Sequence, residues 1–136
     1  MTDFLLDTDT ASRLMRAERA TVNAMRRSGA RSIAVSTVTQ SELIYGAHLR
    51  SDKPALLSAV QAFLSRVEVL PWTTDAAAHH ADVRARAKTA GRGAGAFDMM
   101  IAAHARALGF TLVTGDKAIG NLRIDRLAVV AWPAKG

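Results

Sequence analysis

The chain has 136 residues, of which 49% are hydrophobic, and this is enough to build the core of one domain spanning residues 1–136. It contains no cysteine, which excludes disulfides and thiolate metal sites. Its net charge of +6 favours a polyanionic partner such as nucleic acid, whereas the aromatic content of 5% argues against a base-stacking surface.

The N-terminal residues show no export signal. The stretch MTDFLLD carries acids at positions 3 and 7, and it lacks the basic segment and long apolar segment of a signal peptide. No apolar run in the chain approaches the roughly 18 residues that a membrane span needs. We therefore expect a cytoplasmic protein.

Short apolar runs alternate with helical patterns along the chain. Because these runs are short and lack a clean polar alternation, they are typical of a parallel sheet covered by helices on both faces. The sequence therefore predicts a single α/β domain without internal repeats. The predicted elements, in chain order, are strand 4–6, helix 10–28, strand 33–35, helix 38–49, helix 54–66, strand 67–72, helix 74–90, helix 97–108, strand 110–113 and strand 127–130.

Four acids are predicted to meet at one edge of this sheet. Asp7 directly follows the first strand, and Asp116 comes shortly after the fourth. Asp98 lies at the start of a helix, and Glu42 lies in the first turns of another. Strand ends and helix starts share one rim in such folds, and ligands bind there.

Each acid also has an ordinary structural explanation. Asp98 could cap its helix, Asp116 could be a turn residue in TGDK, and Glu42 could be a solvated helix residue. The convergence of the acids favours a functional explanation, because carboxylates on one rim repel each other and take up protons unless a cation neutralises them. A hard divalent cation, Mg²⁺ or Mn²⁺, suits such oxygen ligands. The histidines lack zinc-type spacing and are expected to be surface or helix residues: His48, His79, His80 and His104.

An acidic metal site on a basic protein indicates metal-assisted cleavage of phosphodiesters. A bound metal ion lowers the pKa of water and offsets charge on the scissile phosphate. Arg84 and Lys88 lie four residues apart on one predicted helix, and Arg92 follows it. These three are candidates to bind the phosphate backbone of the substrate, although a solvated helix face explains them equally well.

Several blocks of the sequence occur together in one known family. They are FLLDTDT (4–10), IAVSTVTQSELIYGA (33–47), GAFDMMIAAHARALGFTLVT (95–114) and, just beyond, Asp116. With these blocks the chain resembles the PIN-domain ribonucleases, and most closely the VapC toxins of bacterial toxin–antitoxin pairs. FLSRVEVLPW (63–72) is similar to the third strand of that family.

The resemblance implies a PIN-like α/β/α sandwich with four or five parallel strands. It implies an Mg²⁺- or Mn²⁺-dependent endoribonuclease that cuts structured RNA, such as tRNA or ribosomal RNA loops, and thereby inhibits growth. It also implies a homodimer and a VapB-type antitoxin, encoded by the neighbouring gene, whose C-terminal segment covers the site.

The resemblance also assigns roles to individual residues. The catalytic and metal-binding acids are Asp7, Glu42, Asp98 and Asp116, by position in the matching blocks. Two hydroxyls that steady the acids come from Thr8 and Thr114.

This sequence departs from the family pattern at two positions. Asp9 stands where the family usually has Asn or Ser, and Gly115 replaces the commoner Asn before the last acid. Asp9 is therefore a supporting residue that either joins the metal shell or, as we expect, hydrogen-bonds a backbone amide.

Two other functions fit parts of the sequence. DTDT matches the D-x-D-x-T motif of haloacid-dehalogenase-like phosphatases, with Asp7 as nucleophile and Asp9 as general acid and base. That motif leaves Glu42 and Asp98 without roles, and no second late acid follows Asp116 at the required spacing. A non-catalytic PIN-like RNA-binding module is the other alternative.

Overall fold

The computed structural model describes residues 2–134. Its five strands form one sheet in the order β3-β2-β1-β4-β5, and every neighbouring pair is parallel. This confirms the predicted parallel α/β fold. The elements are β1 (Thr2–Leu6), α1 (Thr8–Met15), α2 (Arg19–Arg27), β2 (Ala30–Ser36), α3 (Thr37–His48), α4 (Pro54–Leu64), β3 (Glu68–Leu70), α5 (Thr74–Thr89), α6 (Ala96–Leu108), β4 (Thr111–Val113), α7 (Lys117–Leu122) and β5 (Val129–Val130).

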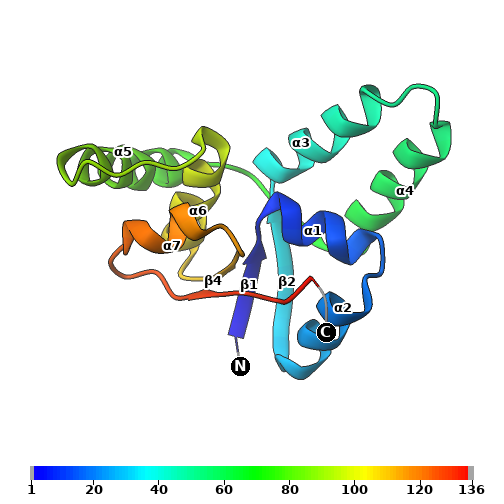
Figure 1. The fold of residues 1–136 in the computed structure, drawn as a ribbon, viewed down its shortest axis with the longest axis horizontal. Helices are drawn as coiled ribbons and strands as arrows, with labels where there is room; N and C mark the ends of the chain where they lie inside the picture. The colour runs from blue at the N-terminus through cyan, green and yellow to red at the C-terminus, as the bar shows by residue number, and fades with distance from the viewer. Residues whose placement is uncertain (1, 135–136) are drawn as a thin grey trace.

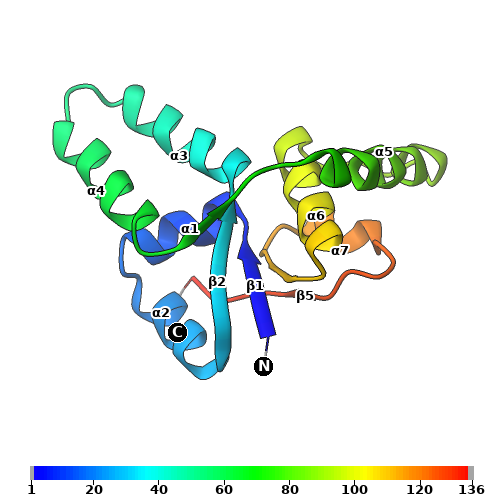
Figure 2. The ribbon, with the colours of Figure 1, turned by 180° about the vertical axis from the view of Figure 1, so that it is seen from behind.

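Helices cover both faces of the sheet, α1 to α4 on one side and α5 to α7 on the other (Figures 1 and 2). Alternate strand residues enter two separate cores. Phe4 and Leu6 of β1 pack in the first core with Val35 and Val113, whereas Leu5 packs in the second. Both faces of the central strands are covered, so the buried ends of β1 and β4 are apolar at successive positions, as the sequence pattern indicated.

The predicted helix 10–28 is wrong, because two helices replace it. Helix α1 ends at Met15 with Arg16 as its C-cap, and Ala17 adopts a left-handed backbone conformation with φ of 55°. The amides of Ala17 and Glu18 donate to the carbonyls of Leu14 and Arg13. This is a Schellman motif, and it was missed because glycine usually occupies the left-handed position. The break turns α2 back toward α1.

A short helix, α7, was also missed. Its N-cap is Asp116, and Gly120 within it weakens the helical signal. The last strand is shorter than predicted, with only Val129–Val130 paired to β4. No helix within residues 2–134 is long and apolar enough to cross a membrane.

The strands β1, β2 and β4 end together. Leu6 of β1 lies beside Val35 of β2 and Val113 of β4. The next amide, that of Asp7, donates to the carbonyl of Val113 at 3.0 Å. The residues that follow these strands therefore start from one edge of the sheet, where the predicted acids are expected.

Candidate active site

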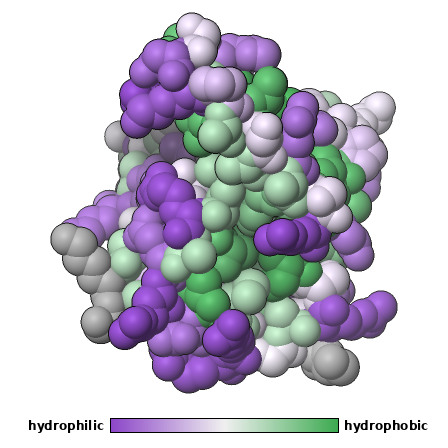
Figure 3. Space-filling view, turned by 90° about the vertical axis from the view of Figure 1, so that its right-hand side faces the viewer, coloured by the Kyte–Doolittle hydropathy of each residue, from purple (hydrophilic) through white to green (hydrophobic). Residues whose placement is uncertain are grey.

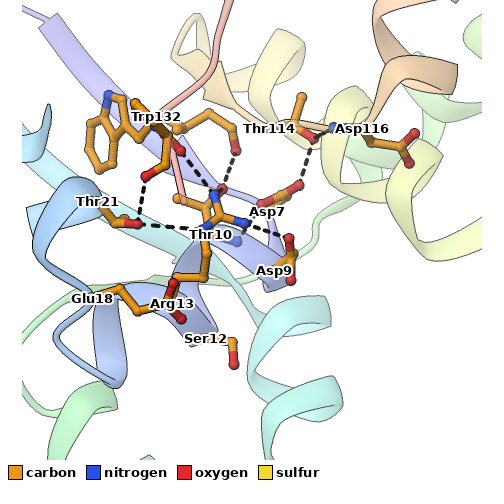
Figure 4. A network of polar contacts seen from close by, with 12 residues as sticks. Asp7, Asp9, Thr10, Ser12, Arg13, Glu18, Thr21, Thr114, Asp116 and Trp132 are labelled. Atoms are coloured by element: carbon orange, nitrogen blue, oxygen red, sulfur yellow. Dashed lines mark hydrogen bonds and ion pairs between the residues drawn. The ribbon is translucent and has the colours of Figure 1, made fainter. Parts of the chain in front are cut away.

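Asp7 is a buried carboxylate at the junction of β1 and α1, and 6% of its surface is exposed. One oxygen, Oδ1, accepts from the backbone amide of Thr10 at 2.8 Å and caps α1. The other, Oδ2, accepts from the hydroxyl of Thr114 at 2.6 Å. That hydroxyl also accepts from the amide of Asp116 at 3.0 Å (Figure 4). Thr114 thus ties the first acid to the loop that carries the last.

Glu42 reaches the same region from α3. Its Oε1 accepts a hydrogen bond of 2.5 Å from the hydroxyl of Thr8, the residue after Asp7. The Thr8 hydroxyl lies 3.1 Å from that of Thr39, which is fully buried one turn before Glu42. The contacts that the resemblance implied for Thr8 and Thr114 are both present. Thr39 was not anticipated, although it lies three residues from Glu42 on one helix face.

Asp98 is the third residue of α6, and it is not the helix cap. The N-cap is Gly95, which has no side chain with which to cap. The Asp98 carboxylate lies so close to Gly95 that a Cβ atom there would stand 2.8 Å from Oδ2. A side chain at position 95 would therefore displace the Asp98 carboxylate, and the loop sequence alone did not show why glycine stands there.

The pKa of Asp98 is affected by all three of the other acids. Burial, which is the largest cause, a hydrogen bond with Asp116 and the charges of Asp116, Asp7 and Glu42 together raise this pKa to about 6. The four acids are therefore near enough to influence one another. A raised pKa is the effect expected of crowded carboxylates without a neutralising cation.

Asp116 is a helix N-cap rather than a simple turn residue. Its Oδ1 accepts from the backbone amide of Ala118 at 2.8 Å and so begins α7. Capping involves one oxygen, and the carboxylate also contributes to the shifted pKa of Asp98. The turn interpretation of Asp116 is therefore replaced by a cap that faces the other acids.

Asp9 does not make the backbone contact that we expected. Its carboxylate accepts from Arg13, one helical turn later, at 2.5 Å. The Asp9 side chain is 79% exposed, whereas that of Arg13 is 10% exposed. The spacing of four residues on a helix was the sequence signal for this pair, and it was overlooked.

Two hollows meet at the acids. One, of about 510 Å³, runs between α1, α3 and α4 and is lined by Glu42, Asp98, polar residues of α1 and apolar side chains. The other, of about 490 Å³, is lined by Asp7, Asp98 and Asp116 together with residues 131–134. Asp9 and Asp98 border both hollows. A ligand at the acids is therefore accessible from two sides.

The four acids suit a hard divalent cation, because such ions prefer carboxylate oxygens as ligands. The raised pKa of Asp98 also indicates that a positive charge would be favourable there. Within residues 2–134, however, no three acidic or imidazole side chains are already arranged as a metal cage. Metal binding would thus require the carboxylates to turn toward one another.

The candidate RNA-binding residues lie together on α5 and in the loop that follows it. Arg84 and Lys88 of α5 border one hollow with Arg92. Arg92 also donates to the carbonyl of Asn121 in α7, at 2.5 Å. The basic cluster therefore adjoins the helix that Asp116 caps.

All four histidines lie on helices, as expected. His104, however, is buried with 1% of its surface exposed, so it is not a surface residue. Burial lowers the pKa of His104 and favours the neutral imidazole. His79 accepts from Arg106 at 2.8 Å.

The shifted pKa of Asp98 predicts how stability depends on pH. The folded protein holds this proton up to about pH 6, whereas the ordinary carboxyl pKa is 3.8. The contribution of Asp98 to stability is therefore present at low pH and is lost as pH rises through this window. In metal-free buffer, we expect the melting temperature of Asp98→Asn to rise relative to that of the wild type as the pH increases from 3.8 to about 6. A constant difference across the window would contradict the crowding of the acids.

The fold and the site define an α/β/α protein with an acidic pocket at the carboxyl end of a parallel sheet. The PIN domain family matches residues 4–125. The chain therefore belongs to the PIN-domain family. This membership removes the support for the phosphatase alternative, and Asp9, its supposed acid and base, is paired with Arg13.

Two sequence relatives are similar over almost their whole length. A tRNA(fMet)-specific endonuclease VapC of Shigella flexneri is 34% identical over 129 residues, covering 92% of this chain and 98% of the relative. A tRNA(fMet)-specific endonuclease VapC of Salmonella typhimurium is 34% identical over 135 residues, with the same coverage.

Solved structures show the same fold in complexes. The DNA-bound VapBC of Salmonella typhimurium matches with a TM-score of 0.86 and 31% identity, covering 98% of this chain and 100% of that chain. VapBC2 of Rickettsia felis, bound to a DNA fragment from its promoter, matches with a TM-score of 0.85 and 26% identity, covering 97% and 100%. Similarity of this extent confirms the PIN-like sandwich.

Proposed function

We propose that this protein is a metal-dependent endoribonuclease and the toxin of a VapBC-type toxin–antitoxin pair. The observation that carries the proposal is that Asp7, Glu42, Asp98 and Asp116 come from four separate elements, and that the other three acids act together with burial to raise the pKa of Asp98 to about 6. The relatives named as tRNA(fMet)-specific endonucleases support RNA, and tRNA in particular, as the substrate.

The four acids are proposed to hold Mg²⁺ or Mn²⁺. When bound, such an ion would lower the pKa of a water molecule and offset charge on the scissile phosphate. Two threonine hydroxyls orient the acids for this role. Thr8 donates to Glu42 and Thr114 donates to Asp7, so two carboxylates are oriented before any ligand arrives. The proton on Asp98 leaves above about pH 6, where its carboxylate becomes an anionic ligand.

Arg84, Lys88 and Arg92 are proposed to contact the RNA backbone. All three border one hollow beside α6, the helix that carries Asp98. Cations so placed offset phosphate charge without reading sequence, which is the usual role of Lys and Arg in nucleic-acid binding.

A VapB-type antitoxin is proposed to cover the groove between α1, α3 and α4. Met15, Leu43, Ala47, Leu56 and Val60 line it beside Glu42 and Asp98. Figure 3 views the side of the molecule with α3 and α4, and shows apolar surface between hydrophilic margins. An apolar groove of this kind suits a partner segment that also blocks the acids. The complexes described as VapBC support such a partner, and we propose a homodimeric toxin within it.

Titration with Mn²⁺ tests the metal site. We expect calorimetric binding in the millimolar range or tighter, and a higher melting temperature, since an ion that binds only the folded state stabilises it by about 2.7 kcal/mol at about 100 times its Kd. Affinity is expected to fall below about pH 6, where Asp98 is protonated. Asp75→Asn, which removes an exposed acid from the first turn of α5, is the control and is expected to bind normally. No binding at millimolar Mn²⁺ would contradict the proposal.

A further inference from the structure

The hollow that contains Asp7, Asp98 and Asp116 has a second wall, which none of the matching sequence blocks includes. Residues 131–134, beyond the last strand, line it opposite the acids. Ala131, Pro133 and Ala134 are exposed, so their surfaces are available to anything that occupies the hollow. We call residues 131–134 the C-terminal wall.

Three contacts fix the C-terminal wall in place. The ring of Trp132 is buried and packs edge-on against Phe4, with 5.4 Å between centroids. The carbonyl of Trp132 accepts from Arg13 Nη2 at 3.0 Å, and that of Pro133 accepts from the Thr21 hydroxyl at 3.0 Å. Figure 1 shows the segment passing from β5 across β1 to α2, and Figure 4 shows Arg13 and Thr21 beside Trp132.

Arg13 joins the wall to the acidic side of the hollow. Its guanidinium donates to the Trp132 carbonyl, to the Asp9 carboxylate and to the hydroxyls of Thr10 and Thr21. Burying a cation is costly unless it is paired and hydrogen-bonded, and these contacts satisfy Arg13 from several directions. The buried Arg13 side chain therefore holds the C-terminal wall in place and also orients the Asp9 carboxylate.

We propose that the C-terminal wall is a specificity-determining surface of the RNA site, and that Arg13 and Thr21 are positioning residues that hold it. The proposal rests on the proposed ribonuclease function. When the scissile phosphate of an RNA lies at the acids, the nucleotides on either side of it occupy the adjoining hollows. The C-terminal wall bounds one of those hollows. The wall then limits which RNA segments enter, while metal binding by the acids does not depend on it.

A bulky substitution on the wall tests its contact with RNA. Ala134→Trp is expected to raise KM for cleavage of a fluorescent tRNA anticodon stem-loop by roughly tenfold, as for a misfit in a shaped site. In the inactive Asp98→Asn background, the same change is expected to weaken binding of this RNA by a similar factor in fluorescence anisotropy. Mn²⁺ affinity and melting temperature are expected to stay within error. Ala62→Trp, on the exposed face of α4, is the control and is expected to change none of these quantities.

A matched pair at position 21 tests the positioning role. Thr21→Val keeps the buried shape but removes the hydroxyl, which donates to Pro133 and accepts from Arg13. We therefore expect KM to rise about fivefold, the equivalent of about one net hydrogen bond, with little change in kcat. Thr21→Ser retains the hydroxyl and is expected to restore the wild-type KM. A merely structural role would lower the melting temperature in Thr21→Val and leave the KM of the folded enzyme unchanged.

The outcomes separate this inference from the function on which it rests. If wild-type protein binds Mn²⁺ and cleaves RNA, but Ala134→Trp behaves like Ala62→Trp, the inference is wrong and the ribonuclease proposal stands. If wild-type protein cleaves no RNA with Mn²⁺ present, both are overturned. Weaker Mn²⁺ binding in Ala134→Trp would also overturn the inference, because the wall would then act on the acids themselves.

Discussion

Asp98→Asn is expected to lower RNA cleavage by at least about a hundredfold, which corresponds to about 2.7 kcal/mol of lost transition-state stabilisation. The Asp98 side chain lies near the other three acids, and its pKa of about 6 reflects burial and these neighbouring carboxylates. Removing its charge would weaken the proposed cation site, and the activation of water would be lost with the cation. Cleavage of tRNA with Mn²⁺, followed on a gel, measures the effect.

The same variant separates a functional acid from a structural one. Because Asn lacks the charge that repels Asp116, metal-free Asp98→Asn is expected to melt at or slightly above the wild-type temperature at neutral pH. Asp75→Asn removes another first-turn acid and is expected to cleave RNA normally. If Asp98→Asn melted several degrees lower and still cut RNA at the wild-type rate, Asp98 would be only a structural residue. A wild-type protein that binds RNA without cutting it would instead support the non-catalytic alternative.

Expression of the protein alone is expected to arrest growth and to lower colony counts by orders of magnitude. A ribonuclease that cleaves tRNA removes a component that translation consumes continuously, so even slow turnover suffices. Co-expression of the protein encoded by the neighbouring gene is expected to restore growth, because that partner would occupy the apolar groove beside Glu42 and Asp98. Colony counts after induction, with and without the partner, measure both effects.

The point variants provide the control for toxicity. Asp98→Asn is expected to be harmless at the same expression level, whereas Asp75→Asn is expected to remain toxic. Harmless expression of wild-type protein that is folded after purification would contradict the toxin assignment. Arrest by Asp98→Asn to the same extent as by wild type would show that growth inhibition does not depend on the acidic site.

The sequence by itself determined the parallel sheet and the four candidate acids. Short strands that are apolar at every position can be stable only with both faces buried, and Phe4, Leu5 and Leu6 do enter opposite cores. Asp7 follows a strand directly and Asp116 comes shortly after one, so their edge of the sheet depended only on strand direction. Hydrophobic periodicity is a local property, and it can be recognised without knowledge of distant contacts.

The tertiary structure alone decided how the site is assembled. The Schellman turn at Ala17 has no glycine to mark it, yet it brings Thr21 to Arg13 and to Pro133. The requirement for Gly95 depends on the approach of the Asp98 carboxylate. The C-terminal wall depends on contacts between residues more than a hundred positions apart, such as Arg13 and Trp132. Such contacts leave no periodic pattern in the chain, because they are set by the packing of whole elements and by the need to pair buried polar groups.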